Sequence, residues 1–383
     1  MNYMKQLIAI TITLISTVLS FGQNGWNDNE FVIGTGFNGA VYASLALPDN
    51  SVVYGGVFTS YNGTNCQGIV KLRSDGTIDP NWIYAGVVNG AQASIGTANV
   101  YDLKLQSDGK ILVVGSFNQY WGLTAPNMAR ISSIDGGLDI PFRDVIITNG
   151  PNGAIWSADL QSDGKIIIGG DFSNLGGGNV RNGVARFNTN GTIDNTFTFS
   201  GTTNATIRKV KTQSDDKILV GGNYTTINGV AKNRITRLNA DGTSDATFLG
   251  TGANNYVLDI EVQSDNKILL SGDFTDYNGS LANRFIRLNA NGTLEGIFNN
   301  CNATVRSLTL LNNGSIVLGG QFNLAPTYSA IRIAVLNSDL TYNTTFANPS
   351  ANNTVFTTSL LADGRIAVGG DFTFFRGLAR NRG

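Results

Sequence analysis

The residues that could do chemistry in this chain are carboxylates, aromatic side chains and a few cations, because the 383-residue sequence contains no histidine. Ser-His-Asp catalysis, Cys-His catalysis and histidine metal ligation are therefore excluded. The two cysteines, Cys66 and Cys301, are too few for a disulfide framework and lie far apart in the sequence. We expect no bridge between them and assign them no role. This inventory predicts a protein that is not an enzyme.

One segment has the residue types of a calcium loop. Asn239, Asp241 and Asp245 are spaced around a glycine, and such acidic loops can bind Ca²⁺ through their oxygens. Equivalent segments exchange acid for amide, as in Asn190 with Asp194. A hard cation needs carboxylate charge, whereas a turn accepts Asp or Asn equally. We therefore predict a turn and no cofactor, with calcium as the alternative.

Three aspartates, Asp171, Asp273 and Asp371, occupy one recurring position. A ring of acids could bind cations, and two carboxylates about 5 to 9 Å apart could cleave a glycosidic bond. Equivalent positions in different repeats are expected to lie too far apart for such a pair, and the remaining copies carry Val, Ser, Asn or Gln there. We interpret these acids as polar strand ends, with a carbohydrate-active hydrolase or lyase as the alternative.

These positions belong to a segment that recurs along the whole chain. Its type copy, residues 105–117, reads Leu-Gln-Ser-Asp-Gly-Lys-Ile-Leu-Val-Val-Gly-Ser-Phe. The last glycines of the copies are Gly56, Gly115, Gly170, Gly222, Gly272, Gly320 and Gly370. They are separated by steps of 59, 55, 52, 50, 48 and 50 residues. A period near 50 is typical of propellers and solenoids.

Each copy predicts a tight hairpin followed by two further strands. In the fourth copy, residues 207–212 alternate, a turn follows, and residues 217–220 form an apolar run that would be buried on both faces. The turns consist of Asp, Asn and Gly, which tolerate a positive φ. A third strand at 235–239 and a short fourth strand ending at Phe248 complete the unit. We predict an all-β, seven-bladed β-propeller of four-stranded antiparallel blades.

The two ends of the chain carry further signals. Residues 1–22 combine Lys5, an apolar run at 7–19 and small residues, which is typical of a secretory signal peptide. Residues 27–31 resemble a fourth strand, so we expect this N-terminal strand to close the last blade. Residues 23–383 would then form the propeller. The last copy lacks its third strand, which favours a chain cut before that strand over an incomplete blade.

The combination of Gln-Ser-Asp-Gly-Lys-Ile, Gly-Gly-Asp-Phe and the later segment Arg237 to Phe248 resembles the delta-60 repeat β-propellers of secreted bacterial proteins. The resemblance covers the chain after the signal peptide and implies a fold rather than an activity. Similar proteins of the Bacteroidetes often carry a C-terminal sorting domain for type 9 secretion. The resemblance thus implies export to the cell surface or medium, with the secretion machinery as a partner.

The connections between strands predict where a ligand would bind. In an up-and-down blade the tight turns share one face, and the long segments 83–99, 118–127, 143–154, 174–182 and 323–329 fall on the other, loop-rich face. Variable loops on a rigid scaffold commonly bind ligands. The aromatic and cationic candidates on this face are Tyr61, Tyr84, Tyr120, Trp121, Arg181, Lys232, Tyr277, Tyr328, Phe375 and Arg376. Such groups suit sugars or protein partners, although each could instead pack beneath the loops.

The net charge of −1 leaves no basic patch for nucleic acid or an acidic membrane, and no segment beyond the first is apolar for long enough to span a bilayer. We therefore predict an exported, non-catalytic binding scaffold for a glycan or protein partner. Adhesion, gliding, or transport as a type 9 secretion passenger would suit it. The alternatives are the carbohydrate-active enzyme and a purely architectural spacer module.

Overall fold

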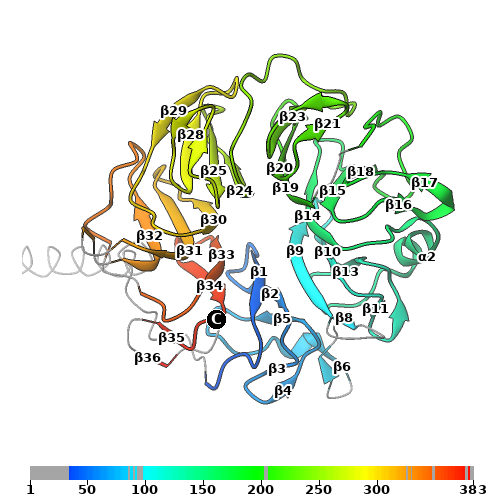
Figure 1. Cartoon of the computed structure of the whole chain (residues 1–383). Helices are drawn as coiled ribbons and strands as arrows, with labels where there is room; N and C mark the ends of the chain where they lie inside the picture. The colour runs from blue at the N-terminus through cyan, green and yellow to red at the C-terminus, as the bar shows by residue number, and fades with distance from the viewer. Residues whose placement is uncertain are drawn as a thin grey trace, which may run out of the picture.

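Antiparallel β-sheets stand side by side around a central axis in the computed structural model of the chain (Figure 1). The structure describes residues 34–84, 87–88, 91–92, 98–201, 206–324, 327–328, 330–346, 350–375 and 378–379. The predicted signal peptide at 1–22, the N-terminal strand at 27–31 and Arg376 lie outside these residues. The fold is all-β with repeated antiparallel sheets, as predicted.

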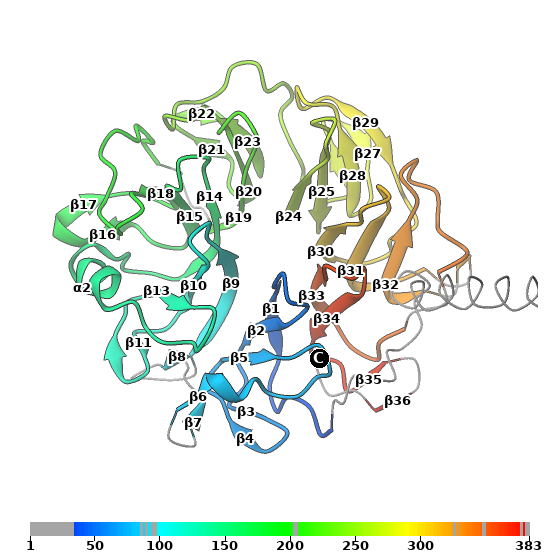
Figure 2. The same ribbon diagram turned by 180° about the vertical axis from the view of Figure 1, so that it is seen from behind.

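The first two strands of each sheet form the predicted hairpin. The pairs are β1 (Val41–Ala46) with β2 (Val52–Gly56), β9 (Asn99–Leu105) with β10 (Lys110–Ser116), β14 (Ile155–Leu160) with β15 (Ile166–Gly170), β19 (Thr206–Thr212) with β20 (Ile218–Asn223), β24 (Val257–Val262) with β25 (Ile268–Gly272), β30 (Val305–Leu310) with β31 (Ile316–Asn323), and β33 (Val355–Leu360) with β34 (Ile366–Gly370). The positive φ predicted for their turns is confirmed at Asn50, Gly109, Gly164, Asp216, Asn266, Gly314 and Gly364. In every pair the first strand lies next to the axis (Figure 2), and we call it the inner strand.

A third strand follows in most sheets, but the fourth strand is shorter than predicted. The third strands are β5 (Ile69–Leu72), β13 (Met128–Ser132), β18 (Val184–Phe187), β23 (Ile235–Leu238), β28 (Phe285–Leu288) and β32 (Ile331–Leu336). Within the described residues only β28 pairs with a full fourth strand, β29 (Leu294–Ile297). Elsewhere a single bridge stands in its place, such as Phe187 to Ile193. There the chain turns away, because the Asp194 carboxylate accepts hydrogen bonds from the backbone and hydroxyl of Thr196.

The second repeat corrects another expectation, because much of residues 143–154 is not an irregular loop. Helix α2 (Ile140–Asn149) occupies most of it. The Asp139 carboxylate caps the helix by accepting from the Phe142 amide at 3.2 Å, and a proline lies in the first turn. Phe142 and Ile146 bury one side of the helix against the sheet. This buried pair, four residues apart, is the helical signal in the sequence.

Small hairpins connect the second and third strands. They are β3 (Ser60–Tyr61) with β4 (Thr64–Asn65), β11 (Gln119–Tyr120) with β12 (Leu123–Thr124), β16 (Asn174–Leu175) with β17 (Asn179–Val180), β21 (Thr226–Ile227) with β22 (Val230–Ala231), β26 (Asp276–Tyr277) with β27 (Ser280–Leu281), and β35 (Phe374–Phe375) with β36 (Leu378–Ala379). The remaining short elements are η1 (Pro80–Trp82), β6 (Ile83–Tyr84), β7 (Val87–Val88), β8 (Ala91–Gln92) and η2 (Gly176–Gly178). The hairpins β3–β4, β16–β17 and β35–β36 lie at the outer rim (Figure 1).

The two glycines that end the second strand are required for two different steric reasons. Each inner strand contains a β-bulge, as where Ile155 pairs with Gly170 and Ser157 with Gly169, so that Trp156 is the extra residue. A Cβ on Gly170 would lie 2.2 Å from the Ala154 carbonyl oxygen, within this bulge. A Cβ on Gly169 would lie 2.6 Å from Ile207 of the next sheet. The second glycine therefore permits the bulge, and the first permits neighbouring sheets to pack closely.

Candidate functional site

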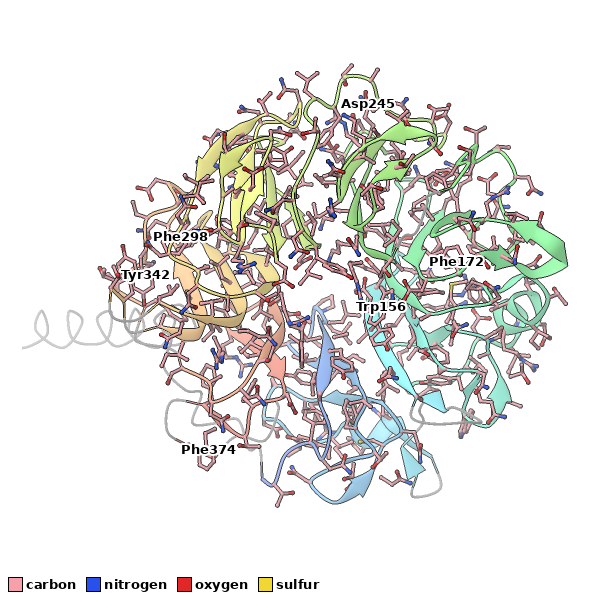
Figure 3. The ribbon with its side chains drawn as sticks, viewed as in Figure 1. Trp156, Phe172, Asp245, Phe298, Tyr342 and Phe374 are labelled. Carbon is pink, nitrogen blue, oxygen red and sulfur yellow. The ribbon has the colours of Figure 1, made fainter. Side chains whose placement is uncertain are left out.

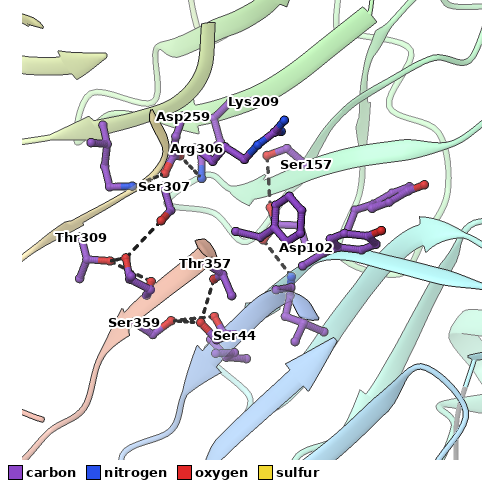
Figure 4. A pocket seen from close by; sticks show the side chains of 18 of the residues that line it. Ser44, Asp102, Ser157, Lys209, Asp259, Arg306, Ser307, Thr309, Thr357 and Ser359 are labelled. Carbon is purple, nitrogen blue, oxygen red and sulfur yellow. Dashed lines mark hydrogen bonds and ion pairs between the residues drawn. The ribbon is translucent and has the colours of Figure 1, made fainter. Parts of the chain in front are cut away.

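A cavity of about 460 Å³ lies at the centre of the array, and inner strands from all around the axis line it (Figure 4). Polar side chains in two registers of these strands line it, together with aromatic and leucine side chains. Lys209 Nζ lies 2.7 Å from Asp259 Oδ1, and Lys211 Nζ lies 2.7 Å from Glu261 Oε2. Burial would lower the pKa of the Lys209 ammonium, but the Asp259 carboxylate outweighs it and holds that pKa above its ordinary value. These cavity residues form two close ion pairs.

The same side chains join neighbouring sheets. The Asp102 carboxylate accepts from the Ala158 amide at 3.1 Å and from the Ser157 hydroxyl at 3.2 Å. The Asp259 carboxylate likewise accepts from the Leu308 amide of the next sheet at 2.7 Å. Buried charges with this many partners are stabilised as ions. The deeper part of the cavity is therefore structural, because its charged groups hold the sheets together.

The mouth of the cavity is different, because the extra residue of each bulge lines it. These residues are Tyr42, Tyr101, Trp156, Arg208, Leu258, Arg306 and Phe356, and we call them the mouth ring. They lie near the start of the inner strands, at the opposite end from the tight hairpin turns, and so on the loop-rich face. Figure 3 shows Trp156 beside the central opening.

The aromatic members of the mouth ring contact one another in sequence around the axis. Trp156 stacks on Tyr101 with ring centroids 3.9 Å apart. Tyr101 then lies 5.8 Å from Tyr42, and Tyr42 lies 5.1 Å from Phe356. The Arg208 guanidinium lies 3.8 Å from the Trp156 ring centroid. The result is one continuous half-buried wall with a cation stacked at its end.

The two arginines of the mouth ring have no hydrogen-bond partner for their Nε atoms within the part of the chain that the structure describes. Arg306 lies over Phe356 at 5.3 Å, and on its other side only Leu258 stands between it and Arg208 in the order of the inner strands. The Nε atoms of Arg208 and Arg306 are buried and find no acceptor among the described residues. Burial lowers the pKa of both guanidinium groups, and the nearby charges of Asp171 and Asp273 oppose this. Both arginines remain positively charged near neutral pH, since arginine titrates far above it.

The three aspartates noted in the sequence lie near the mouth, and each has a donor of its own. Asp171 accepts from the Trp156 indole at 2.7 Å, and Asp371 accepts from the Asn353 amide at 3.1 Å. Asp273 accepts from the Thr304 hydroxyl and lies 3.7 Å from the Arg284 guanidinium.

The candidate calcium loop lies away from the axis, where Figure 3 labels Asp245 at the periphery. Asp241 accepts from the Thr243 amide and hydroxyl, at 2.9 and 2.7 Å, and so forms an ordinary turn. The Asp245 carboxylate accepts from Arg237 at 2.7 Å and lies 3.1 Å from Lys217. Protein donors therefore already hold both carboxylates.

Three of the predicted site residues are buried and are corrected here. Tyr61, Tyr120 and Tyr277 are at most 1% exposed. Their hydroxyls donate to the carbonyls of Gly76, Gly136 and Gly292, at 2.8, 3.2 and 2.7 Å. A tyrosine at this hairpin position fills the space between the hairpin and the next turn, so it cannot contact a ligand on the surface.

The other described candidates are dispersed over the outer parts of the sheets. Trp121 is 40% exposed at a hairpin tip. Arg181 donates to the Val180 carbonyl, and Lys232 donates to the carbonyls of Phe248 and Gly250.

Tyr328 stacks on Tyr342 with centroids 4.2 Å apart, and Phe375 packs 5.8 Å from Phe372. Tyr84 is part of β6, but its side chain, like the whole of Arg376, lies outside the description. None of the described candidates lines the cavity.

Sequence reasoning missed the mouth ring, although a signal for it exists. When the repeats are aligned on the glycine that ends the second strand, the residue after the first Val or Ile of each inner strand is aromatic or arginine in every copy except Leu258. Within any single copy this residue looks like one more polar or apolar position in a strand. Only the shared register places these side chains around one opening.

Comparisons with known proteins agree with the fold. Residues 47–81, 106–139, 161–197, 213–248 and 263–295 match the family model described as "Domain of unknown function (DUF5122) beta-propeller". No protein with a curated description matches the sequence significantly. The helices of the described residues include none long and apolar enough to cross a membrane.

Solved structures of propellers superpose on most of the chain. The WD40 beta propeller domain of Doa1 matches with a TM-score of 0.55 and 15% identity, over 88% of this chain and 90% of that one. The extracellular domain of a protein described as a one-component system, BT4673 from B. thetaiotaomicron, matches with a TM-score of 0.53 and 14% identity, over 90% of this chain and 39% of that one. At such identities the likeness concerns the fold alone. The chain is thus built of β-propeller repeats, five of which match the DUF5122 model.

Proposed function

We propose that this protein is an exported, non-catalytic binding module whose mouth ring holds a glycan. The mouth ring carries this proposal, because it gathers aromatic rings and two arginines whose Nε atoms have no acceptor among the described residues around one opening. The ring residues sit on paired strands, so their geometry is fixed before a ligand arrives, and this lowers the entropic cost of binding. A pocket with apolar walls and a few directed polar groups is the usual form of a small-ligand site.

The cavity supports binding better than hydrolysis. A glycosidase needs two carboxylates free to act as acid and base or nucleophile. The carboxylates of Asp102, Asp259 and Glu261 are already held by lysines or by amides of the next sheet. Moving a proton onto any of them would break a bond between sheets. The enzyme therefore stays the alternative function, and a spacer without a ligand leaves the mouth ring unexplained.

The rigid ring that this function needs is also a proposal. We infer seven blades, the last completed by the N-terminal strand at residues 27–31. The Ser44 hydroxyl lies 2.8 Å from the Thr357 hydroxyl, and a Cβ on Gly369 would lie 2.5 Å from Val41, so the first and last inner strands are neighbours. This proximity supports closure, although the proposed closing strand lies outside the described residues.

Export by type 9 secretion, with a role in adhesion or gliding, is the cellular context that we propose. Its support is the leader-like sequence of residues 1–22, the resemblance of the repeats to those of secreted bacterial proteins, and the fold shared with an extracellular domain. In that setting a surface glycan is accessible as a ligand. A protein partner at the same mouth is the alternative.

A glycan array probed with the purified protein tests the proposal. We expect binding that Tyr101→Ala weakens at least about tenfold, because this substitution removes the middle of the aromatic wall. Phe374→Ala is the matched control, since Phe374 is a 49% exposed aromatic at the outer rim (Figure 3). Mass spectrometry of the glycan after incubation with the protein should detect it uncleaved. Cleaved product would establish the enzyme instead, and binding that Tyr101→Ala leaves unchanged would place the site elsewhere.

A further inference from the structure

Among the described residues, several hydrogen-bond donors at the mouth have no partner, whereas the acidic side chains there each accept at least one hydrogen bond. The Nε atoms of Arg208 and Arg306 have no partner among the described residues, and no described residue hydrogen-bonds the hydroxyls of Tyr42 or Tyr101. The three aspartates near the mouth, by contrast, each accept from a neighbouring side chain. A ligand that completes this arrangement must bring acceptors.

The hydroxyls of Tyr42 and Tyr101 remain hydrogen-bond donors at neutral pH. Burial raises the pKa of both the Tyr42 and the Tyr101 hydroxyl above the usual value, so both keep their protons at neutral pH. The two buried arginines would be stabilised by a further negative charge. Burial lowers the pKa of Arg306, and the positive charge of Arg208 lowers it further, against the opposing Asp273 carboxylate. An anion between the two guanidinium groups would relieve this repulsion.

We propose that the mouth ring binds an acidic saccharide, with the carboxylate of a hexuronate ring held by Arg208 and Arg306. This inference rests on the proposed function and names its ligand class. Guanidinium groups bind carboxylates through paired N–H donors, and such charge-assisted bonds are stronger than neutral ones. The sugar ring would lie along the aromatic wall with its C–H groups against the rings and its hydroxyls toward the phenols.

The size and the charge of the site favour this ligand over its competitors. The cavity of about 460 Å³ falls within the range of about 300 to 1,000 Å³ that is usual for small-ligand sites. A neutral sugar would cover the two arginines without adding a counter-charge to those of Asp171 and Asp273, and burying charge that is incompletely paired is costly. A peptide carboxylate could meet the arginines, but peptide recognition generally relies on a free strand edge or a groove. The mouth instead offers a wall of stacked rings.

Calorimetric titration of the protein with matched saccharides tests the inference. The probes are galacturonate, glucuronate and mannuronate trimers, each paired with its neutral hexose trimer. We expect at least one acidic trimer to bind at least about tenfold more tightly than its neutral partner, and higher salt to weaken it. The variant Arg208→Gln/Arg306→Gln should lose at least about tenfold in affinity. Arg208→Lys/Arg306→Lys keeps the charge and should lose less.

Arg365→Gln is the control for each single replacement, because it removes one arginine charge from a residue that bonds Asp363 beside a tight hairpin turn, at the other end of the inner strands. The Arg365→Gln variant should bind the acidic trimer as tightly as the unmodified protein does. All variants should have the melting temperature of the unmodified protein. Neutral trimers that bind as well as acidic ones at a Tyr101-dependent site would overturn the inference while leaving the proposed function intact. Affinity that the double glutamine variant retains would also overturn it. Binding of a tripeptide carboxylate but of no trimer would replace the saccharide with a peptide and count against both.

Discussion

The hydroxyl oxygens of Ser44 and Ser359 lie 2.7 Å apart, although 315 residues separate them in the chain. Ser359 also donates to the Ser44 carbonyl at 2.8 Å, and the Ser44 hydroxyl contacts Thr357 as well. Strands β1 and β33 thus meet through side chains rather than through a backbone ladder. The same kind of contact joins earlier neighbours, such as Thr309 and Thr358 at 2.7 Å. The junction between the ends of the array therefore resembles its internal junctions.

Removing this junction should lower stability measurably. Ser44→Ala deletes bonds to two hydroxyls, and a typical intramolecular hydrogen bond contributes about 0.5 to 1.5 kcal/mol, so we expect a loss of about 1 to 3 kcal/mol in the free energy of unfolding. Urea denaturation of Ser44→Ala, Ser359→Ala and the double variant gives the coupling energy, which should reach at least about 0.5 kcal/mol. Thr309→Val serves as the internal-junction comparison. Strict additivity of the two serine variants would mean that the ends do not meet in solution.

Replacing Asp by Asn should change the free energy of unfolding very differently at the two acids of the candidate calcium loop, Asp241 and Asp245. Asp245→Asn leaves Arg237 buried without its anion, and removing one member of a buried ion pair costs about 3 to 5 kcal/mol. Asp241→Asn keeps the turn, as Asn190 and Asn291 do in other repeats, and should cost less than about 0.5 kcal/mol. Thermal or urea unfolding measures both. A melting temperature that falls when a chelator is added would instead reveal a bound cation.

Stability should fall in acid because carboxylates such as Asp194 are held ionised. Burial alone would raise the pKa of Asp194, but hydrogen bonds from Thr196 and the charges of Arg186 and Lys165 outweigh it and lower the pKa to about 2. A group whose pKa is depressed by folding stabilises the protein above its unfolded value of about 3.9, and this contribution disappears as pH falls toward 2. Unfolding free energies measured between pH 5 and 2 should therefore decline. Asp194→Asn should be less stable at pH 5 and decline less steeply.

Hairpins were predictable because local chemistry determines them. The turn residues Asn50, Gly109 and Asp216 adopt the positive φ that their residue types tolerate, and each apolar run that follows is buried on both faces. The fourth strands were not predictable in the same way. Whether the chain after the third strand continues its ladder depends on a side chain, since Asp194 turns the backbone back at Thr196. The sequence signal for a strand and that for a turn are both present there, and tertiary context selects between them.

The mouth ring was not predicted from the sequence, because its residues come from different sheets and meet only in the folded chain. Trp156 and Arg208 are 52 positions apart in the chain, and each stands in a strand that looks ordinary alone. The predicted aromatic residues were in loops, where exposure is expected, yet Tyr61 and Tyr277 fill the interior because their hairpins fold back onto the sheets. The mouth ring lies on the loop-rich face, where a site was predicted, and ligand binding on this face stays a prediction. The bulge turns these residues toward the axis, and its sequence signal is the glycine that ends the second strand rather than the bulge residue itself.

The glycine doublet allows this bulge to be tested directly. At Gly170 an added Cβ would meet the Ala154 carbonyl oxygen at 2.2 Å, which is backbone and cannot yield, whereas at Gly169 it would meet the methyl group of Ile207, which can shift. Ser271 already stands at the position of Gly169 in the fifth repeat. We therefore expect Gly169→Ser to cost about 1 to 3 kcal/mol and Gly170→Ser to cost more than Gly169→Ser in the same urea titration. Because Trp156 is the bulge residue, Gly170→Ser should also weaken ligand binding at the mouth ring more than Gly169→Ser does. Equal losses of unfolding free energy for Gly169→Ser and Gly170→Ser would mean that the bulge does not require a glycine at position 170.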